Sequence, residues 1–447
     1  MVLKKVFIPS LQQLCLSKIA IAVVNDPEVK KFVKNYGANY CIWPSEEIEK
    51  FLNPKSKPFP VFNVRQTKAD RYWRHGDTSD FYVASYGQNL PLPSKEWDIL
   101  IHKKLSTLFL PDSLMKDATA LSVYAAIQID RWVKDHVNIL NSDLNFDINF
   151  YWTQDAKIDR EKTAKALINS DILDIAVRFQ LACYYCFEEE IIVLWKKMNM
   201  NEWKRVRKNE LIIVHVWSKY LLEETFDWGL LASLSIVNPL GLRSFYEGLS
   251  ERKRRMWLQS VLKSRRMEYR ELQFCFSKLN ETNQIELYKA CPFEILVMFL
   301  EWPLQTEIFG ALEFLWPYLS GKNFRDFLHL IIFQKIMLGS KDFNYVPIIK
   351  KLWHQTPAHF KEFIVMDELY DSLKLIIEND RLQSSPYSTL IRNYDCNYFK
   401  FFSSGVLYVL VNGHDFFFFH DESSFHDLYG YRNYDIISFD KIVKNES

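Results

Sequence analysis

Glycine and proline are scarce in this sequence, with 12 and 16 residues in a chain of 447. Sheets joined by tight turns need both residues at those turns, so the scarcity disfavours a hairpin-rich β fold and favours long helices. It also excludes much chemistry, because none of the motifs GxxxxGK[ST], GxGxxG and GxSxG occurs, and neither does HExxH. We therefore expect a protein that is not an enzyme and that needs no cofactor.

The chain also lacks net charge and long apolar runs. Its 56 basic and 55 acidic residues leave a net charge of +1, so no global field favours nucleic acid or a membrane surface. The longest apolar runs, such as Ile19–Val24, are far shorter than a membrane-spanning helix. We expect neither nucleic-acid nor membrane partners. The seven cysteines are odd in number and scattered, which is typical of reduced thiols in the cytoplasm or nucleus.

Apolar side chains at helical spacing are abundant. Apolar residues make up 48% of the chain and aromatic residues 16%, enough for a sizeable core. From about Glu161 to Glu378 one helical stripe follows another, for example Ile172, Ile175, Phe179, Ala182 and Cys186.

A weak repeat recurs within this helical region. Each copy has an aromatic residue, a leucine three positions later and then a capping residue that opens the next helix. The copies begin at Tyr246, Phe276 and Trp316, at intervals of 30 and 40 residues, which is the range of helix-pair repeats. We predict a mostly α fold, a stacked array of helical hairpins similar to an α-solenoid.

Four segments are predicted: an N-terminal helical module (1–53), a proline-containing irregular segment with a following helix (54–110), the helical repeat body (111–384) and an aromatic-rich C-terminal segment (385–447). Short irregular or β segments are expected near 55–95, with a strand at Tyr82–Ala84, and in the C-terminal tail. There, Asn412–Gly413 between two apolar runs suits a β-hairpin with a type I′ turn.

Two clusters resemble metal or redox sites. Cys183-Tyr-Tyr-Cys186 is a lone CxxC that lacks a second pair and lies inside an apolar stripe, so we interpret it as two buried structural thiols. The pairs at His414, His420 and His426, each followed by Asp, recur every six residues. On a helix that spacing does not share a face, and turn signals interrupt a strand, so no metal site is expected.

The densest positive cluster is a candidate phosphate-binding patch or nuclear import signal. It comprises Arg252, Lys253, Arg254, Arg255, Arg265 and Arg266. The alternative is an ordinary solvated helix pair, balanced by Glu247, Glu251, Glu268 and Glu271, and we favour that alternative.

The motif with the sharpest implication is Ser10-Leu11-x-x-x-Cys15-x-x-x-Ile19. Ser10 and Gln13 form a capping box that opens a helix, and Asp26-Pro27 opens a second one. Leu11 and Cys15 then lie one turn apart on one face, so an aliphatic side chain can enter a pocket while the small thiol permits close approach.

This motif resembles the BC box of SOCS-box proteins, the element that binds the Elongin B–Elongin C adaptor. SOCS boxes continue into a cullin box built around Leu-Pro-x-Pro, and this chain has Leu90-Pro91-Leu92-Pro93, followed by Ile99, Leu100 and Leu105 at helical spacing. The chain departs from the family in two ways. About seventy residues separate the two halves, which are usually adjacent, and both halves lie near the N-terminus instead of the C-terminus.

The resemblance implies a substrate-recognition adaptor of a cullin-type ubiquitin ligase. Ser10, Leu11, Cys15 and Ile19 would bind Elongin B–Elongin C, Leu90 to Pro93 would face the cullin, and the helical body would hold an unknown target protein. The alternative is a helical-repeat scaffold with no ubiquitin-ligase link, in which Leu11, Cys15 and Ile19 pack as ordinary core against the helix at 27–36.

Overall fold

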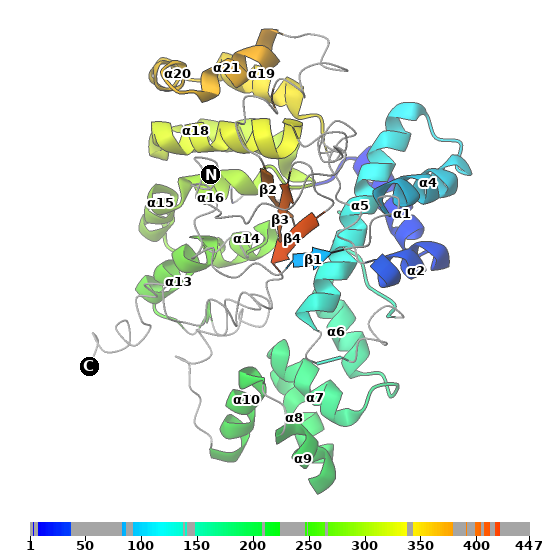
Figure 1. Ribbon diagram of the computed structural model, residues 1–447. Helices are drawn as coiled ribbons and strands as arrows, with labels where there is room; N and C mark the ends of the chain where they lie inside the picture. The colour runs from blue at the N-terminus through cyan, green and yellow to red at the C-terminus, as the bar shows by residue number, and fades with distance from the viewer. Residues whose placement is uncertain are drawn as a thin grey trace. The chain divides into compact units, whose positions relative to one another are not determined.

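The computed structural model describes residues 3, 8–36, 83–85, 93–136, 139–140, 148–207, 211–223, 246–247, 249–263, 267–337, 343–378, 390, 398–403, 406–411 and 416–420. Most of these residues are helical (Figure 1). The chain divides into two compact units, the first made of Met1–Ser10, Arg131–Leu304 and Asp435–Ser447, the second of Leu11–Asp130 and Gln305–Tyr434.

Short helices dominate the first unit. They are α6 (Arg160–Ile168), α7 (Ile175–Tyr184), α8 (Glu188–Lys197), α9 (Met200–Arg207), α10 (Ile212–Glu223), α13 (Glu251–Lys263), α14 (Tyr269–Ser277), α15 (Glu281–Ala290) and α16 (Pro292–Met298). Helix α7 contacts α6, α8, α9 and α10, while α13 contacts α14, α15 and α16. Their starts follow local chemistry: Asp159 and Asp174 accept hydrogen bonds from backbone N–H groups in the first turns of α6 and α7.

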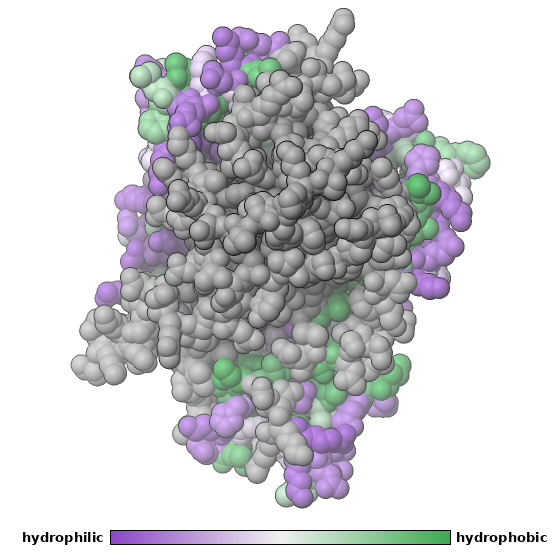
Figure 2. Space-filling view, in the orientation of Figure 1, coloured by the Kyte–Doolittle hydropathy of each residue, from purple (hydrophilic) through white to green (hydrophobic). Residues whose placement is uncertain are grey.

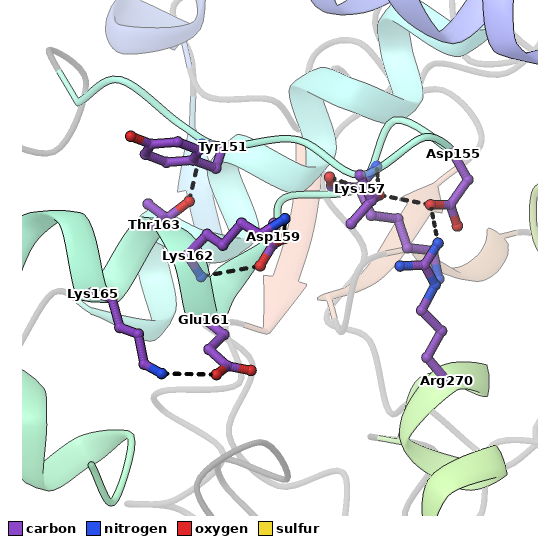
Figure 3. A network of polar contacts seen from close by, with 10 residues as sticks. Tyr151, Asp155, Lys157, Asp159, Glu161, Lys162, Thr163, Lys165 and Arg270 are labelled. Carbon is purple, nitrogen blue, oxygen red and sulfur yellow. Dashed lines mark hydrogen bonds and ion pairs between the residues drawn. The ribbon is translucent and has the colours of Figure 1, made fainter. Parts of the chain in front are cut away.

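A tight turn before α6 ties these helices together (Figure 3). The Thr153 N–H donates to the carbonyl of Lys157 at 2.8 Å, and Trp152 bridges to Ile158. Arg270 of α14 donates to the buried Asp155 carboxylate at 2.8 Å. The Trp302 indole N–H donates to the Asp155 carbonyl at 3.2 Å. The turn is therefore fixed by groups that come from three parts of the first unit.

An aromatic cluster around His136 lies in the core of the first unit. Its ring stacks on Trp132 and Tyr185, with centroids 3.9 and 5.5 Å away. Its Nδ1 lies 2.6 Å from the Trp132 carbonyl and its Nε2 lies 2.9 Å from the Tyr185 hydroxyl. Because a carbonyl only accepts, Nδ1 carries the proton and Nε2 accepts from the hydroxyl. Burial, followed by the nearby Arg160, lowers the pKa of His136 to about 4.

The second unit begins with α1 (Leu11–Val24), α2 (Pro27–Tyr36), α4 (Pro93–Ser106) and most of α5 (Asp112–Asp135). Helices α1, α2 and α4 contact one another. Phe32 of α2 packs on the buried Trp97 of α4, with ring centroids 5.8 Å apart. The Lys104 ammonium at the end of α4 pairs with Asp26 and Glu28 at the start of α2, which fixes the C-terminal end of α4 beside the turn after α1.

Later helices of the second unit are most of η5 (Leu304–Glu307), then α17 (Ile308–Leu315), η6 (Trp316–Tyr318), α18 (Gly321–His329), the π-helix η7 (Leu330–Met337), α19 (Tyr345–Gln355), α20 (Ala358–Val365) and α21 (Leu369–Glu378). Ser320 and Asn323 form a capping box at α18. Arg325 of α18 donates to Asp367 at 2.9 Å. Burial, followed by Arg325, lowers the pKa of His329 to about 3.

A four-stranded antiparallel sheet completes the second unit. Its strands are β1 (Val83–Ser85), β2 (Tyr398–Ser403), β3 (Val406–Val411) and β4 (Phe416–His420), in the order β1-β4-β3-β2. The strands predicted near Tyr82–Ala84 and around Asn412–Gly413 lie where the structure has β1, β3 and β4. The predicted two-residue turn is wrong, because Leu410 pairs with Phe417 and four residues separate β3 from β4.

The mostly α prediction is confirmed, with local corrections. The helices predicted after Ser10 and Asp26 begin at Leu11 and Pro27. Ile172 does not share a helical stripe with Phe179, because Asp174 caps α7 and leaves Ile172 outside it and exposed. Within the described residues, no helix has the length and apolar character needed to cross a bilayer.

Candidate adaptor-binding helix

Helix α1 carries the motif residues Leu11, Cys15 and Ile19, and its exposed face is mainly apolar apart from Gln12 and Lys18. One face is buried and packs in the helical group of α1, α2 and α4; it comprises Leu16, Ser17, Ala20, Val23 and Val24. A surface helix ordinarily has polar residues opposite its buried face. Helix α1 has instead the sequence LQQLCLSKIAIAVV, which contains one charged residue and no acidic one.

The face of α1 opposite this core holds the motif. Leu11 is 77% exposed and Cys15 is exposed. Ile19 is half-buried, and Ser10, which precedes the helix, is exposed. Lys18 and Ala22 continue the exposed stripe at helical spacing. Leu11 and Cys15 are therefore not part of the core, which α1 builds from other residues.

The cullin-box-like segment is only partly described. Leu90, Pro91 and Leu92 lie outside the described residues, and Pro93 is the first residue of α4. In the helix that follows, Ile99 is 68% exposed, Leu100 is half-buried and Leu105 is buried. Pro93 suits the first turn of a helix, where no backbone N–H is needed.

The basic cluster lies mostly on α13, where its central residue makes internal contacts. Arg254 donates to the carbonyls of Tyr246, Glu247 and Lys278. Arg255 is half-buried, 4.0 Å from Glu286, whereas Arg252 is exposed and Lys253 half-buried. Arg265 and Arg266 lie outside the described residues. Of the described part of the cluster, Arg254 is oriented by the fold towards carbonyl groups and not towards a ligand.

The CxxC pair lies at the end of α7. Cys183 is buried inside the helix, and Cys186 follows it with a φ of 53°. Burial raises the pKa of both thiols, that of Cys186 to about 12, so both stay protonated at neutral pH. Among the described residues, no group of three or more His, Cys, Asp or Glu side chains could hold a metal ion. His420 ends β4, and the described residues do not include His414 or His426.

Sequence reasoning missed an apolar tip between α4 and α5. Leu108 is 47% exposed and Phe109 93% exposed, and Figure 2 shows apolar residues at the outer end of α4. The backbone of Phe109 has a φ of 50°, a conformation that favours glycine. Backbone hydrogen bonds from Leu108 to Leu105 and from Phe109 to Ser106 fix the tip. No glycine marks the position of Phe109, and the nearest turn signal is Pro111-Asp112, which opens α5.

A recurring helix–helix contact was also missed. Arg254, four residues after Ser250, donates to the Tyr246 carbonyl at 3.0 Å, and its guanidinium lies 5.9 Å from the Tyr246 ring. Gln284, four residues after the cap Asn280, donates to the Phe276 carbonyl at 3.1 Å. In both cases a donor in the first turn of one helix binds the aromatic anchor that precedes it. Partially negative carbonyls at a helix end favour such donors.

A related contact, to the residue that follows an aromatic side chain, lies at the start of α20. Lys361 lies four residues after Pro357, the cap of α20, and donates to the His354 carbonyl at 3.3 Å. Its ammonium lies 5.7 Å from the ring of Trp353. Trp353 follows Trp316 by 37 residues, inside the interval of the predicted repeat. Thr356 stands where the three predicted copies have leucine, so the aromatic–leucine–cap pattern does not include Trp353.

Comparison of the chain with models of protein families, with curated proteins and with solved structures finds no match.

Proposed function

We propose that this chain is a non-enzymatic interaction protein that binds the Elongin B–Elongin C adaptor through α1 and serves as a substrate-recognition subunit of a cullin-type ubiquitin ligase. The observation that carries the proposal is the orientation of α1. Its motif residues Leu11 and Cys15 are exposed, while the other face of the helix makes the core.

The second apolar face of α1 is unusual for a surface helix. An exposed leucine alone would need no explanation. Here Leu11 is 77% exposed on a helix without acidic residues, one turn before an exposed cysteine. Apolar stripes of this kind mark helices that enter a groove of a partner. The stripe also has the residue types of the BC box.

The helical body would present the target. We propose that it is an array of helix-pair repeats, with anchors at Tyr246, Phe276, Trp316 and Trp353. In three copies the anchor contacts an aromatic ring of the next helix: Tyr246 with Trp257, Phe276 with Tyr288 and Trp316 with Phe324, at centroid distances of 5.4, 5.1 and 5.2 Å. Helical repeats of this size offer extended binding surfaces.

Recovery of Elongin B and Elongin C with the tagged full-length chain from cells tests the proposal. We expect both to be recovered with the wild type, and both to be lost with the double variant Leu11→Ser and Cys15→Phe. Met366→Ser is the matched control, because Met366 is an exposed apolar residue outside α1. Circular dichroism checks that each variant folds.

Equal recovery with the double variant, or no recovery with the wild type, would refute the adaptor. The alternative would then be a helical-repeat scaffold without a ubiquitin-ligase link. The support for that alternative is the set of recurring helix–helix contacts.

A further inference from the structure

Lys18 occupies the middle of the exposed stripe of α1. The stripe residues Leu11, Cys15, Lys18 and Ala22 are separated by four, three and four positions, so they follow one face over successive turns. All four are exposed. Lys18 is the only charged residue of α1, and within the described part of the chain it makes no ion pair. A charge at the centre of an apolar stripe restricts what can cover it.

We propose that α1 binds a groove on a different protein chain, which is apolar where it receives Leu11 and carries a carboxylate opposite Lys18. This inference rests on the proposed function of α1 as an adaptor-binding helix. Lys18 lies seven positions after Leu11, so the carboxylate lies about 10 Å along the groove from the leucine pocket.

The neighbours of Lys18 favour a close contact. Cys15 and Ala22 are the stripe residues on either side of it, and both are small, so the partner backbone can approach the helix there. The lysine stem can then lie along the apolar groove while its ammonium reaches a carboxylate at the rim. A buried ammonium without such a partner would oppose binding, because the lost hydration would not be replaced.

A second copy of this chain is a poorer occupant. In a symmetric pair, each Lys18 would face either the other Lys18 or the apolar residues of the same stripe. The first arrangement places like charges together, and the second buries a charge without a partner. Helix α1 has no acidic residue that a copy could offer instead. The charge pattern therefore points to a chain of different sequence.

Binding of the purified full-length chain to purified Elongin B–Elongin C at several salt concentrations tests this inference. Lys18→Glu should weaken binding tenfold or more, because two like charges would meet, and Lys18→Ala should weaken it about threefold and flatten the salt dependence. Lys18→Arg should bind like the wild type. Lys31→Glu, an exposed residue of α2, is the matched control and should change affinity little.

The outcomes distinguish a failure of the proposed function from a failure of the carboxylate inference. If the wild type does not bind, the proposed function fails and the inference with it. If the wild type binds and the Leu11→Ser, Cys15→Phe variant does not, but Lys18→Glu binds as the wild type does, the adaptor function stands and the carboxylate is refuted. Self-association of the wild type that Leu11→Ser abolishes would identify a second copy as the occupant and overturn the inference.

Discussion

Replacing His136 by glutamine should remove a large part of the acid sensitivity of the first unit. The neutral imidazole is buried between Trp132 and Tyr185, and its pKa is lowered from 6.5 to about 4. In the unfolded chain the imidazole has its ordinary pKa. Below pH 6.5 the unfolded state therefore binds a proton that the folded state does not, and stability falls with pH.

The size of this effect follows from the two pKa values. Above pH 6.5 the imidazole is neutral in both states and contributes no pH dependence. Each unit of separation is worth about 1.4 kcal/mol, so the full loss between pH 6.5 and pH 4 is about 3 kcal/mol. At pH 5 about 2 kcal/mol of it is already lost. Glutamine does not titrate, and its amide can still bind the Tyr185 hydroxyl.

Urea unfolding at pH 7 and pH 5, followed by tryptophan fluorescence, measures the difference. Between these pH values the wild type should lose about 2 kcal/mol more stability than His136→Gln. His102→Gln is the control, because His102 is exposed on α4, and its loss should equal that of the wild type. An equal loss for wild type and His136→Gln would refute the assignment of a buried neutral imidazole. The pKa of the buried His329 is also lowered, to about 3. Its protonation in the unfolded chain therefore leaves part of the acid sensitivity in every variant.

Substitutions at three further positions test other features of the fold, each by urea unfolding. Gln284→Ala removes two buried hydrogen bonds, to the carbonyls of Phe276 and Leu279, and should lower stability by about 1–3 kcal/mol. An unchanged stability would show that these hydrogen bonds do not stabilise the contact between α14 and α15. Asp155→Ala removes the acceptor of Arg270, whose side chain is half exposed, and should cost about 1–3 kcal/mol, while Asp155→Asn should cost less. Phe109 has a left-handed backbone conformation and an exposed ring. Asparagine adopts this conformation with less strain, so Phe109→Asn should raise stability by about 0.5–1 kcal/mol. A lower stability of the variant would show that the ring makes a stabilising contact.

Local signals in the sequence predicted where several helices begin. Ser10 and Asp26 mark the starts of α1 and α2 because their side chains can satisfy free N–H groups; the Asp26 carboxylate accepts from the Glu28 N–H at 2.9 Å. The aromatic–leucine–cap pattern marks helix starts at Asn280 and Ser320. These interactions join residues within four positions of one another, so a single sequence contains both partners.

Interactions between distant residues were beyond the sequence. His136 and Tyr185 are 49 positions apart, and Asp155 and Arg270 are 115 apart; no periodicity connects either pair. The turn between β3 and β4 was mispredicted because Asn412–Gly413 indicates a two-residue turn, whereas strand register depends on pairing along the whole hairpin.

The candidate site was predicted in composition but not in orientation. The spacing of Leu11 and Cys15 placed them on one face, but a helix with two apolar faces gives no sequence signal for which face is buried. Packing against α2 and α4 decides it. The role of Arg254 could not be predicted for a similar reason. The sequence of a basic cluster is the same whether its side chains are solvated or donate to backbone carbonyls of a neighbouring segment.

Size-exclusion chromatography with light scattering, on the purified full-length chain mixed with purified Elongin B–Elongin C, tests whether the chain binds this adaptor. The exposed Leu11–Cys15 face of α1 predicts a single peak whose mass equals the sum of one copy of each chain. Separate peaks at the masses of the free components, at concentrations well above micromolar, would contradict it.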